Sequence, residues 1–364
     1  MVGQVSAVRG KDQRRILDDA AGMAAGLFDP LSLAYGCSFD PPKVVRTSPI
    51  AVIRLLAERV EDAGSLNLAT SLLEGLGAVL PADSTNAGRV LAQRARVSWK
   101  MGNVDLALAR YQTLRRKARH AESNELLIRA WAGYGAIAQL RGNYPNVRHW
   151  AGRIVDRAER CRYNRLASLG HHGLMVAYAV AREFSEAISH GWSSYRGRDG
   201  DRSGQIEMLA NIGRLFFDAG DYAVARSALV KVLAAKPGLR VGASALGGFA
   251  LVSAAIGDRT AVRWAASEAS SLMDQPSSRY NTASALLDCA NALDAMGESP
   301  YGSVLRARGS TIAQYAGYHE LVHRAQSAPM GRPTPLAAPA IAVAVEIGRL
   351  PEVELPDRLE LVTA

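Results

Sequence analysis

Apolar residues recur at helical spacing through most of the chain, in segments that come in pairs. The segments "RVLAQRARVSWKM" (89–101) and "VDLALARYQTLRRKAR" (104–119) both place apolar side chains three and four residues apart, with only a short turn between them. The segment "IEMLANIGRLFFD" (206–218) leads into a similar pair. This pattern predicts amphipathic α-helices joined by tight turns, and therefore an all-α protein.

The turns within these pairs recur at a nearly constant interval. Glycine suits the left-handed conformation that ends a helix, and Asp, Asn or Ser beside it can cap the next helix. Successive turns lie 38, 40, 40, 38, 37 and 40 residues apart. The seven turns are Gly64-Ser65, Gly102-Asn103, Gly142-Asn143, the weaker Arg182-Glu183, Gly220-Asp221, Gly257-Asp258 and Gly297-Glu298. Such a period indicates stacked units, so we expect an α-solenoid of about seven antiparallel helix pairs with a period of 37–40 residues.

Small residues keep the same register as the turns. Five positions after each turn marker stand Ala69, Ala107, Val147, Ala187, Ala225, Val262 and Gly302. Seven positions before it stand Ala57, Ala95, Gly135, Met175, Gly213, Ala250 and Ala290. Small side chains at matched places let paired helices approach closely, as a stacked array requires.

The array is expected over residues 49–326, where Ser48-Pro49 begins the first helix. Residues 1–48 are predicted to hold an N-terminal capping helix and an irregular linker. Residues 327–364 are Pro/Ala-rich and are expected to form a partly ordered C-terminal cap. Within this tail, "IAVAVEI" (341–347) alternates weakly, and we expect it to form an extended segment.

Three stretches resemble the tetratricopeptide-repeat family. They are the turns with their second helices, "GDYAVA" (220–225), "GNVDLA" (102–107) and "REFSEA" (182–187). The period exceeds the family's usual length of about 34 residues, and no regular Pro ends each unit, so the chain is similar to a long-period variant such as those in bacterial regulators. The resemblance implies a groove that binds peptides or proteins. Residues at comparable places in the family clamp the C-terminal carboxylate of a peptide.

Composition narrows the class of protein. Hydrophobic residues make up 48% and charged residues 21%, which is ordinary for a folded chain. The three cysteines are far apart, so a disulfide scaffold is not expected. No signal peptide or membrane span is expected, since "PLAAPAIAVAVEI" (335–347) is too short and contains Pro339. These features predict a cytoplasmic protein without membrane contact.

The positive charge is concentrated in one segment. Residues 86–165 contain 17 Lys and Arg against 5 Asp and Glu, whereas the rest of the chain is slightly acidic. This distribution favours an acidic partner, such as an acidic or carboxylate-bearing peptide or protein, or nucleic acid bound by "LRRKARH" (114–120) and later arginines. Aromatic residues for base stacking are not interleaved with these cations, and no helix-turn-helix precedes the array. An Arg-rich solvated exterior is the alternative interpretation.

The first helix of each pair in a solenoid lines the concave surface. Polar residues counted back from the turns therefore form the predicted ligand-binding set, which is Arg54, Arg89, Gln93, Arg96, Lys100, Arg129, His172, Asn211 and Arg214. Arg donates in a rigid fork that matches a carboxylate or phosphate, and an Asn amide can bind peptide backbone. Solvated polar positions on exposed helices are again the alternative.

One string carries recognisable chemistry. "HELVH" (319–323) would hold zinc through His319 and His323, with Glu320 as general base and Glu346 as a third ligand. However, the string falls where the next first helix is expected, and the rest of the chain leaves little room for a substrate cleft. No other catalytic residue or cofactor motif is expected.

The sequence therefore predicts a non-catalytic cytoplasmic scaffold that binds a peptide or protein in a basic concave groove. A signal-peptide-sensing regulator, transcriptional or in phage or bacterial signalling, with nucleic-acid contact through residues 86–165 is the alternative. A zinc hydrolase is the third hypothesis. Neither the ligand nor the oligomeric state follows from the residues.

Overall fold

The computed structural model describes residues 49–62, 65–272, 279–316, 318–325 and 338–350. The capping helix and linker expected within residues 1–48 lie outside this range, as does Gly64 of the first turn. Within it every regular element is an α-helix, so the predicted all-α class is confirmed. None of the described helices combines the length and apolar character of a membrane-spanning segment.

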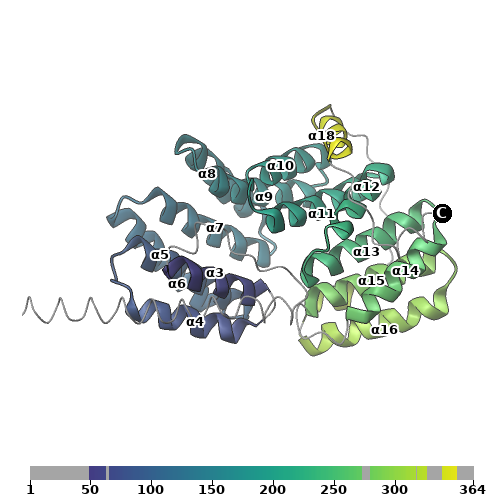
Figure 1. The fold of residues 1–364 in the computed structure, drawn as a ribbon, viewed down its shortest axis with the longest axis horizontal. Coiled ribbons are helices and arrows are strands. Elements are labelled where there is room, and N and C mark those ends of the chain that lie inside the picture. The colour runs from purple at the N-terminus through teal and green to yellow at the C-terminus, as the bar shows by residue number, and fades with distance from the viewer. Residues whose placement is uncertain (1–48, 63–64, 273–278, 317, 326–337, 351–364) are drawn as a thin grey trace, which may run out of the picture. The chain divides into compact units, whose positions relative to one another are not determined.

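Sixteen helices follow one another in the described ranges (Figure 1). They are α3 (Pro49–Asp62), α4 (Leu66–Val79), α5 (Thr85–Lys100), α6 (Val104–His120), α7 (Asn124–Leu140), α8 (Tyr144–Arg160), α9 (Asn164–Val180), α10 (Phe184–Arg196), α11 (Arg202–Ala219), α12 (Tyr222–Ala234), α13 (Leu239–Ala255), α14 (Arg259–Ser271), α15 (Arg279–Ala295), α16 (Ser299–Ala316), α17 (His319–Ala325) and α18 (Ala338–Arg349).

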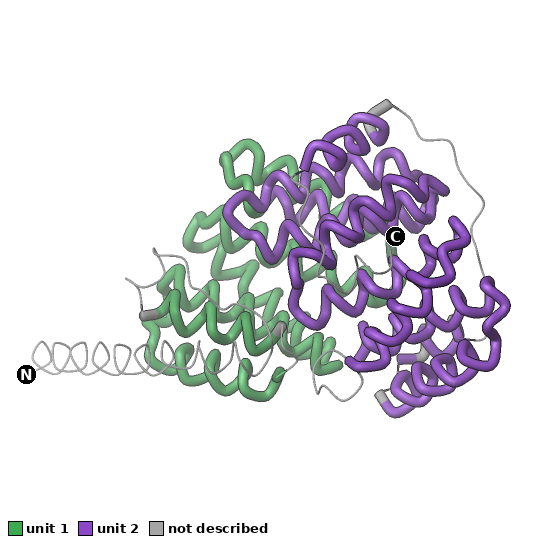
Figure 2. The backbone as a smooth tube through the Cα atoms, turned by 45° about the vertical axis from the view of Figure 1, so that its right-hand side comes forward, with its two compact units in different colours: residues 1–166 green, residues 167–364 purple. Residues whose placement is uncertain are grey.

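The helices divide into two compact units, residues 1–166 and 167–364 (Figure 2). In the first unit, α3 packs on α5 and α5 on α7, while α4, α6 and α8 each pack against the first helix that precedes them. In the second unit, α11 packs on α13 and α13 on α15, with α12, α14 and α16 paired in the same way. Sequential packing of helices in each unit matches the predicted α-solenoid. We call α3, α5, α7, α9, α11, α13 and α15 the first helices, and α4, α6, α8, α10, α12, α14 and α16 the second helices.

The six predicted turns in the described range adopt one backbone geometry. The marker residue has a positive φ in each, at Gly102, Gly142, Arg182, Gly220, Gly257 and Gly297. The N–H that follows the marker bonds to the carbonyl five residues earlier, as from Asn103 to Ser98 at 2.9 Å and from Asp258 to Ser253 at 2.8 Å. This is the Schellman closure of a helix C-terminus. The repeated turn is therefore confirmed, including the weak Arg182 marker, whose φ is 61°.

Three of the residues beside the markers also cap the next helix with their side chains. Asn143, Asp221 and Asp258 accept from the backbone N–H three residues later, at 3.2, 3.2 and 3.0 Å. Asn103 and Glu183 stand at the same place without such a bond. The backbone turn is therefore the constant element of the repeat, and the side-chain cap adds to it where the residue type allows.

The small residues in register are core residues. All seven that follow the markers are buried, and those that precede them are buried except for the half-buried Gly135. A Cβ atom on Gly302 would lie 2.6 Å from Asp294 Oδ1 and 3.0 Å from the Ala290 carbonyl oxygen, so α16 meets α15 too closely for a side chain there. The predicted close approach of paired helices is therefore present in the packing.

The last two helices pack on different parts of the second unit. Helix α17 contacts α15 and α16, and its Leu321 is buried. Helix α18 contacts α10 and α12 and buries Ala340, Val343 and Ile347. The expectation of an extended segment over 341–347 is wrong, because alanine favours helix and the three buried residues fall on one helical face.

Candidate functional site

Six of the nine predicted ligand-binding residues lie on the stacked first helices of the first unit. Arg54 is on α3, while Arg89, Gln93, Arg96 and Lys100 are on α5; Arg129 is on α7. Gln93 is buried, and its Nε2 donates to the carbonyl oxygen of Arg54 at 3.1 Å, which joins α5 to α3. We call this set and the carboxylates that bind it the unit 1 array.

Glu125, in the first turn of α7, holds two of these arginines. Its carboxylate accepts from Nε and Nη2 of Arg89 at 2.8 and 2.6 Å, and from Nε of Arg129 at 3.0 Å. Burial opposes ionisation of this carboxyl, but the two guanidinium groups outweigh it and lower its pKa to about 2. Glu125 is therefore charged at neutral pH and fixes Arg89 and Arg129 next to each other.

Glu61, near the end of α3, holds the other two cations of α5. Its carboxylate is fully buried and lies 2.7 Å from Arg96 Nη2 and 2.7 Å from Lys100 Nζ. Arg96 also lies 3.5 Å from Glu58, one turn earlier on α3. Burial opposes ionisation of Glu58, but Arg96, Arg165 and Arg54 outweigh it and hold its pKa below the usual range. Arg96 and Lys100 are therefore partly neutralised.

Arg54 differs from its neighbours, because no carboxylate in the part of the chain that the structure describes lies within ion-pair distance of it, and Glu58 and Glu125 act on it only from further away. It makes no ion pair with any residue in the described ranges, and its Nε is buried without a hydrogen-bond partner there. Burial and the nearby cations Arg129 and Arg89 together lower the pKa of Arg54 to about 10, against the opposing effects of Glu58 and Glu125. A half-buried guanidinium beside two others is a place where an anion would be stabilised.

The remaining three predicted residues belong to the second unit. Arg214 on α11 bonds to Asp288 Oδ2 on α15 at 3.1 Å and to Asp218 Oδ1 at 3.4 Å. Burial opposes the charge of Arg214, but Asp288 and Asp218 outweigh it and raise its pKa. This arginine is therefore held between two carboxylates, one of them the buried Asp288.

His172 lies in a second charged cluster of the same unit. Burial lowers its pKa to about 4, against the opposing effect of Glu207, so the imidazole is neutral at pH 7. Glu207 on α11 accepts from Arg240 Nη1 at 2.8 Å, and Arg198 Nη1 lies 3.7 Å from it. Asn211 lies on α11 between Glu207 and Arg214 and is half-buried. Asn211 and Arg214 are thus on α11 and His172 is on α9, where Glu207 of α11 acts on it.

The sequence prediction included the cations but not the carboxylates that bind them. Five acidic residues of the first helices fill this role, namely Glu58, Glu61, Glu125, Asp218 and Asp288. Spacing alone could have suggested some of them. Glu58 and Glu61 follow Arg54 at i+4 and i+7, and Glu125 precedes Arg129 by four residues, so each pair shares a helix face.

The zinc hypothesis stays a prediction. The side chains of His319 and Glu320 lie outside what the structure describes, while His323 is exposed on α17. Glu346 is on α18, which packs on α10 and α12, and it forms an ion pair with Arg349 at 2.8 Å. Among the described residues, no three His, Cys, Asp or Glu side chains are grouped in a way that could hold a metal ion.

Comparison with known proteins adds no assignment, since no family model and no curated protein matches the chain. The helical repeat therefore rests on the periodic turns and the packing described above.

Proposed function

We propose that the protein is a non-catalytic binding scaffold, similar to the tetratricopeptide repeats, whose unit 1 array binds a carboxylate of a peptide or protein segment. The proposal depends on the environment of Arg54. It is a half-buried cation without an ion pair in the described ranges, and burial, Arg129 and Arg89 lower its pKa. Burying a charge without a partner is costly, so an incoming anion would gain free energy there.

The surrounding network supports the same proposal. Glu125 holds Arg89 and Arg129 in place by three short contacts, and Gln93 ties α5 to the backbone of α3 at Arg54. Side chains that are already fixed lose little conformational entropy when a ligand binds. The planar guanidinium of Arg54 offers a fork that matches the two oxygens of a carboxylate. A peptide carboxylate is therefore a better match to this place than a neutral group.

A peptide with a free C-terminus tests the proposal. Selection of a random peptide library with free C-termini on the full-length protein would supply the probe, and fluorescence anisotropy would measure its affinity. The Arg54→Ala variant should weaken binding at least ten-fold, since a charge-assisted hydrogen bond contributes about 1.5–3 kcal/mol. Amidation of the C-terminus should have a similar effect.

Arg59→Ala is the matched control. Arg59 is on the same helix five residues further on, about 140° around the axis from Arg54. Binding to this variant should stay within about two-fold of the wild type, because Arg59 is partly exposed and lies outside the unit 1 array. Equal affinities for the Arg54→Ala and Arg59→Ala variants, or for free and amidated peptides, would contradict the proposal.

A signal-sensing regulator that also contacts nucleic acid is the second candidate. The observation in its favour is the row of exposed cations at the end of α6, where Arg116 and Arg119 are followed by His120. This candidate would be supported if the protein retained duplex DNA, and if the retention weakened steeply with salt. The retention should be lost when Arg116 and Arg119 are both replaced by Ala. Retention that is unchanged in this variant would count against it.

A further inference from the structure

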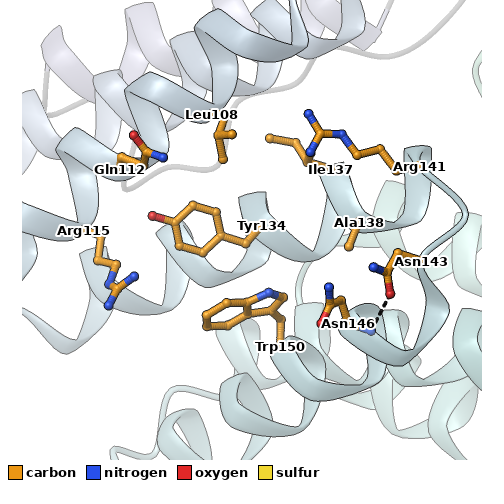
Figure 3. A pocket seen from close by; sticks show the side chains of 10 residues that line it. All are labelled: Leu108, Gln112, Arg115, Tyr134, Ile137, Ala138, Arg141, Asn143, Asn146 and Trp150. Atoms are coloured by element: carbon orange, nitrogen blue, oxygen red, sulfur yellow. Dashed lines mark hydrogen bonds between the residues drawn. The ribbon is translucent and has the colours of Figure 1, made fainter.

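A groove of about 290 Å³ lies on the first unit (Figure 3), and none of the residues that line it belongs to the unit 1 array. It is formed by the consecutive second helices α6 and α8, with residues of α7 between them. No sequence pattern predicted this groove, because the residues that line it come from three helices and the turn between two of them.

The middle of the groove is apolar and aromatic. Leu108 of α6 and Ile137 and Ala138 of α7 line it together with the rings of Tyr134 and Trp150. The two ring centroids are 5.2 Å apart, with an angle of 49° between the ring planes. This surface is suited to one or two apolar side chains of a ligand.

Polar groups surround this apolar surface. Arg115 on α6 makes no ion pair with a residue in the described ranges, and Arg141 at the end of α7 has only a loose one, 3.9 Å from the fully exposed Asp105. Gln112 and Asn146 add amide groups at the rim. The positive charges of Arg115 and Arg141 are thus hardly neutralised by carboxylates, and they lie beside an apolar surface. This arrangement favours a ligand that is apolar in the centre and acidic at its edges.

The second unit shows what can occupy such a place. Helix α18 packs against α10 and α12, which are also consecutive second helices. It buries Ala340, Val343 and Ile347, spaced i, i+3 and i+7, and Lys231 of α12 donates to the carbonyl oxygen of Leu350 at 3.0 Å. In this chain, therefore, an amphipathic helix covers two neighbouring second helices through one apolar face.

We propose that the groove between α6 and α8 is a second binding site, and that it takes an amphipathic helix of a partner protein with apolar residues at i, i+3 and i+7 and acidic residues beside them. The site is separate from the proposed carboxylate site and does not depend on it. Nucleic acid matches the groove less well, because the faces of the aromatic rings of the groove pack on neighbouring side chains and are not open to stack on a base. Trp150 packs on Tyr134 and Trp131, and Arg153 lies 4.5 Å above the ring of Trp131.

The probe is an acetylated and amidated helical peptide of about 15 residues, the length at which an isolated helix begins to be stable. It has Leu at i, i+3 and i+7 and Glu on both sides of this stripe. Since both ends are blocked, it has no terminal carboxylate for Arg54. Anisotropy with the full-length protein should show saturable binding that weakens as salt is added. A peptide with the same composition but scrambled Leu positions should bind at least ten-fold more weakly.

Charge reversal locates the binding. The Arg115→Glu and Arg141→Glu double variant should bind the peptide at least ten-fold more weakly, and a peptide with Lys in place of Glu should bind this variant better than it binds the wild type. The control is the Arg116→Glu and Arg148→Glu double variant, which has the same charge change at exposed positions of α6 and α8 outside the groove. Its affinity and that of Arg54→Ala should stay within about two-fold of the wild type. Circular dichroism should show the same helix content in all variants.

Three results would overturn the proposal. The first is equal weakening by the groove and control variants. The second is a loss with Arg54→Ala as large as with the groove variant, which would place the peptide on the unit 1 array and leave the proposed function standing. The third is no binding of the acidic peptide, while a single-stranded oligothymidine binds and depends on Arg115 and Arg141. By contrast, the second site is supported if the peptide no longer binds the Arg115→Glu and Arg141→Glu double variant but still binds the control variants. This conclusion holds whether or not Arg54 binds a carboxylate.

Discussion

Replacing Glu125 by Gln removes the negative charge that holds Arg89 and Arg129 together. The Glu125 side chain is 19% exposed and accepts three contacts of 2.6 to 3.0 Å. Its pKa is about 2 in the folded protein, against an ordinary value of about 4.3. A difference of a little over two pKa units corresponds to roughly 3 kcal/mol of stability at pH 7.

The sign of this contribution determines its pH dependence. Because the folded pKa is lower than the unfolded one, the stabilisation is complete above the unfolded pKa and is lost as the pH falls through the folded pKa. At pH 3 about 1.4 kcal/mol of the roughly 3 kcal/mol should remain, and little should remain below pH 2. We therefore expect the difference in unfolding free energy between the wild type and Glu125→Gln to shrink by about half between pH 7 and pH 3.

Urea unfolding followed by circular dichroism at both pH values measures this difference. Subtracting the variant from the wild type removes the contribution of the other carboxylates, since both proteins contain them. Glu122→Gln is the control, because Glu122 is exposed in the turn before α7 and makes no ion pair within the described ranges. A difference below about 0.5 kcal/mol at pH 7, or one of equal size at pH 7 and pH 3, would show that the Glu125 network does not stabilise the first unit as argued.

Three further outcomes concern the fold and the second unit. Gly220 and Arg182 both have the left-handed backbone conformation, which glycine adopts more easily than any residue with a Cβ atom. Gly220→Ala should therefore lower the free energy of unfolding by about 1 kcal/mol, and Arg182→Gly should raise it. Urea titration would refute this if both changes were destabilising. Ile347→Ala should cost about 2–4 kcal/mol and Ile341→Ala almost nothing, since only Ile347 is buried where α18 packs on α10 and α12, and equal melting temperatures of the two variants would contradict this. Burial lowers the pKa of His172 to about 4, so between pH 6.5 and pH 4 this residue is protonated only in the unfolded state, which lowers the free energy of unfolding of the wild type as the pH falls. His172→Asn should remove this contribution, and a variant with the same pH profile of stability as the wild type would disprove it.

The repeat could be predicted from the sequence because its causes are local. A helix end in the left-handed conformation favours glycine, and a close approach of two helices excludes a large side chain, as at Gly302. Both requirements leave a mark at fixed positions, so the period and the turn geometry were correct even for Arg182. The alternation over 341–347 misled for the opposite reason, since it is a short Ala-rich pattern that either a strand or a helix could produce.

The site residues were predictable only in part. Counting back from the turns identified cations on the first helices, but it could not show which of them carry a neighbouring carboxylate. Arg89 and Glu125 are 36 residues apart, and Arg96 and Glu61 are 35 apart, so the pairing depends on how adjacent repeats stack. Arg54 stands out only once these pairs are known.

The residue pattern alone is enough to predict an all-helical chain of repeated pairs, the places of its turns and its small core positions, since these follow from backbone conformation and side-chain size within one repeat. Tertiary structure decided the rest. It paired the arginines with carboxylates of neighbouring helices, placed Tyr134 and Trp150 beside Arg115, and packed α18 on α10 and α12, where Lys231 meets Leu350 across 119 residues. The physical reason is that charge compensation and burial depend on which atoms are near in space, and no local pattern records that for residues so far apart in the chain.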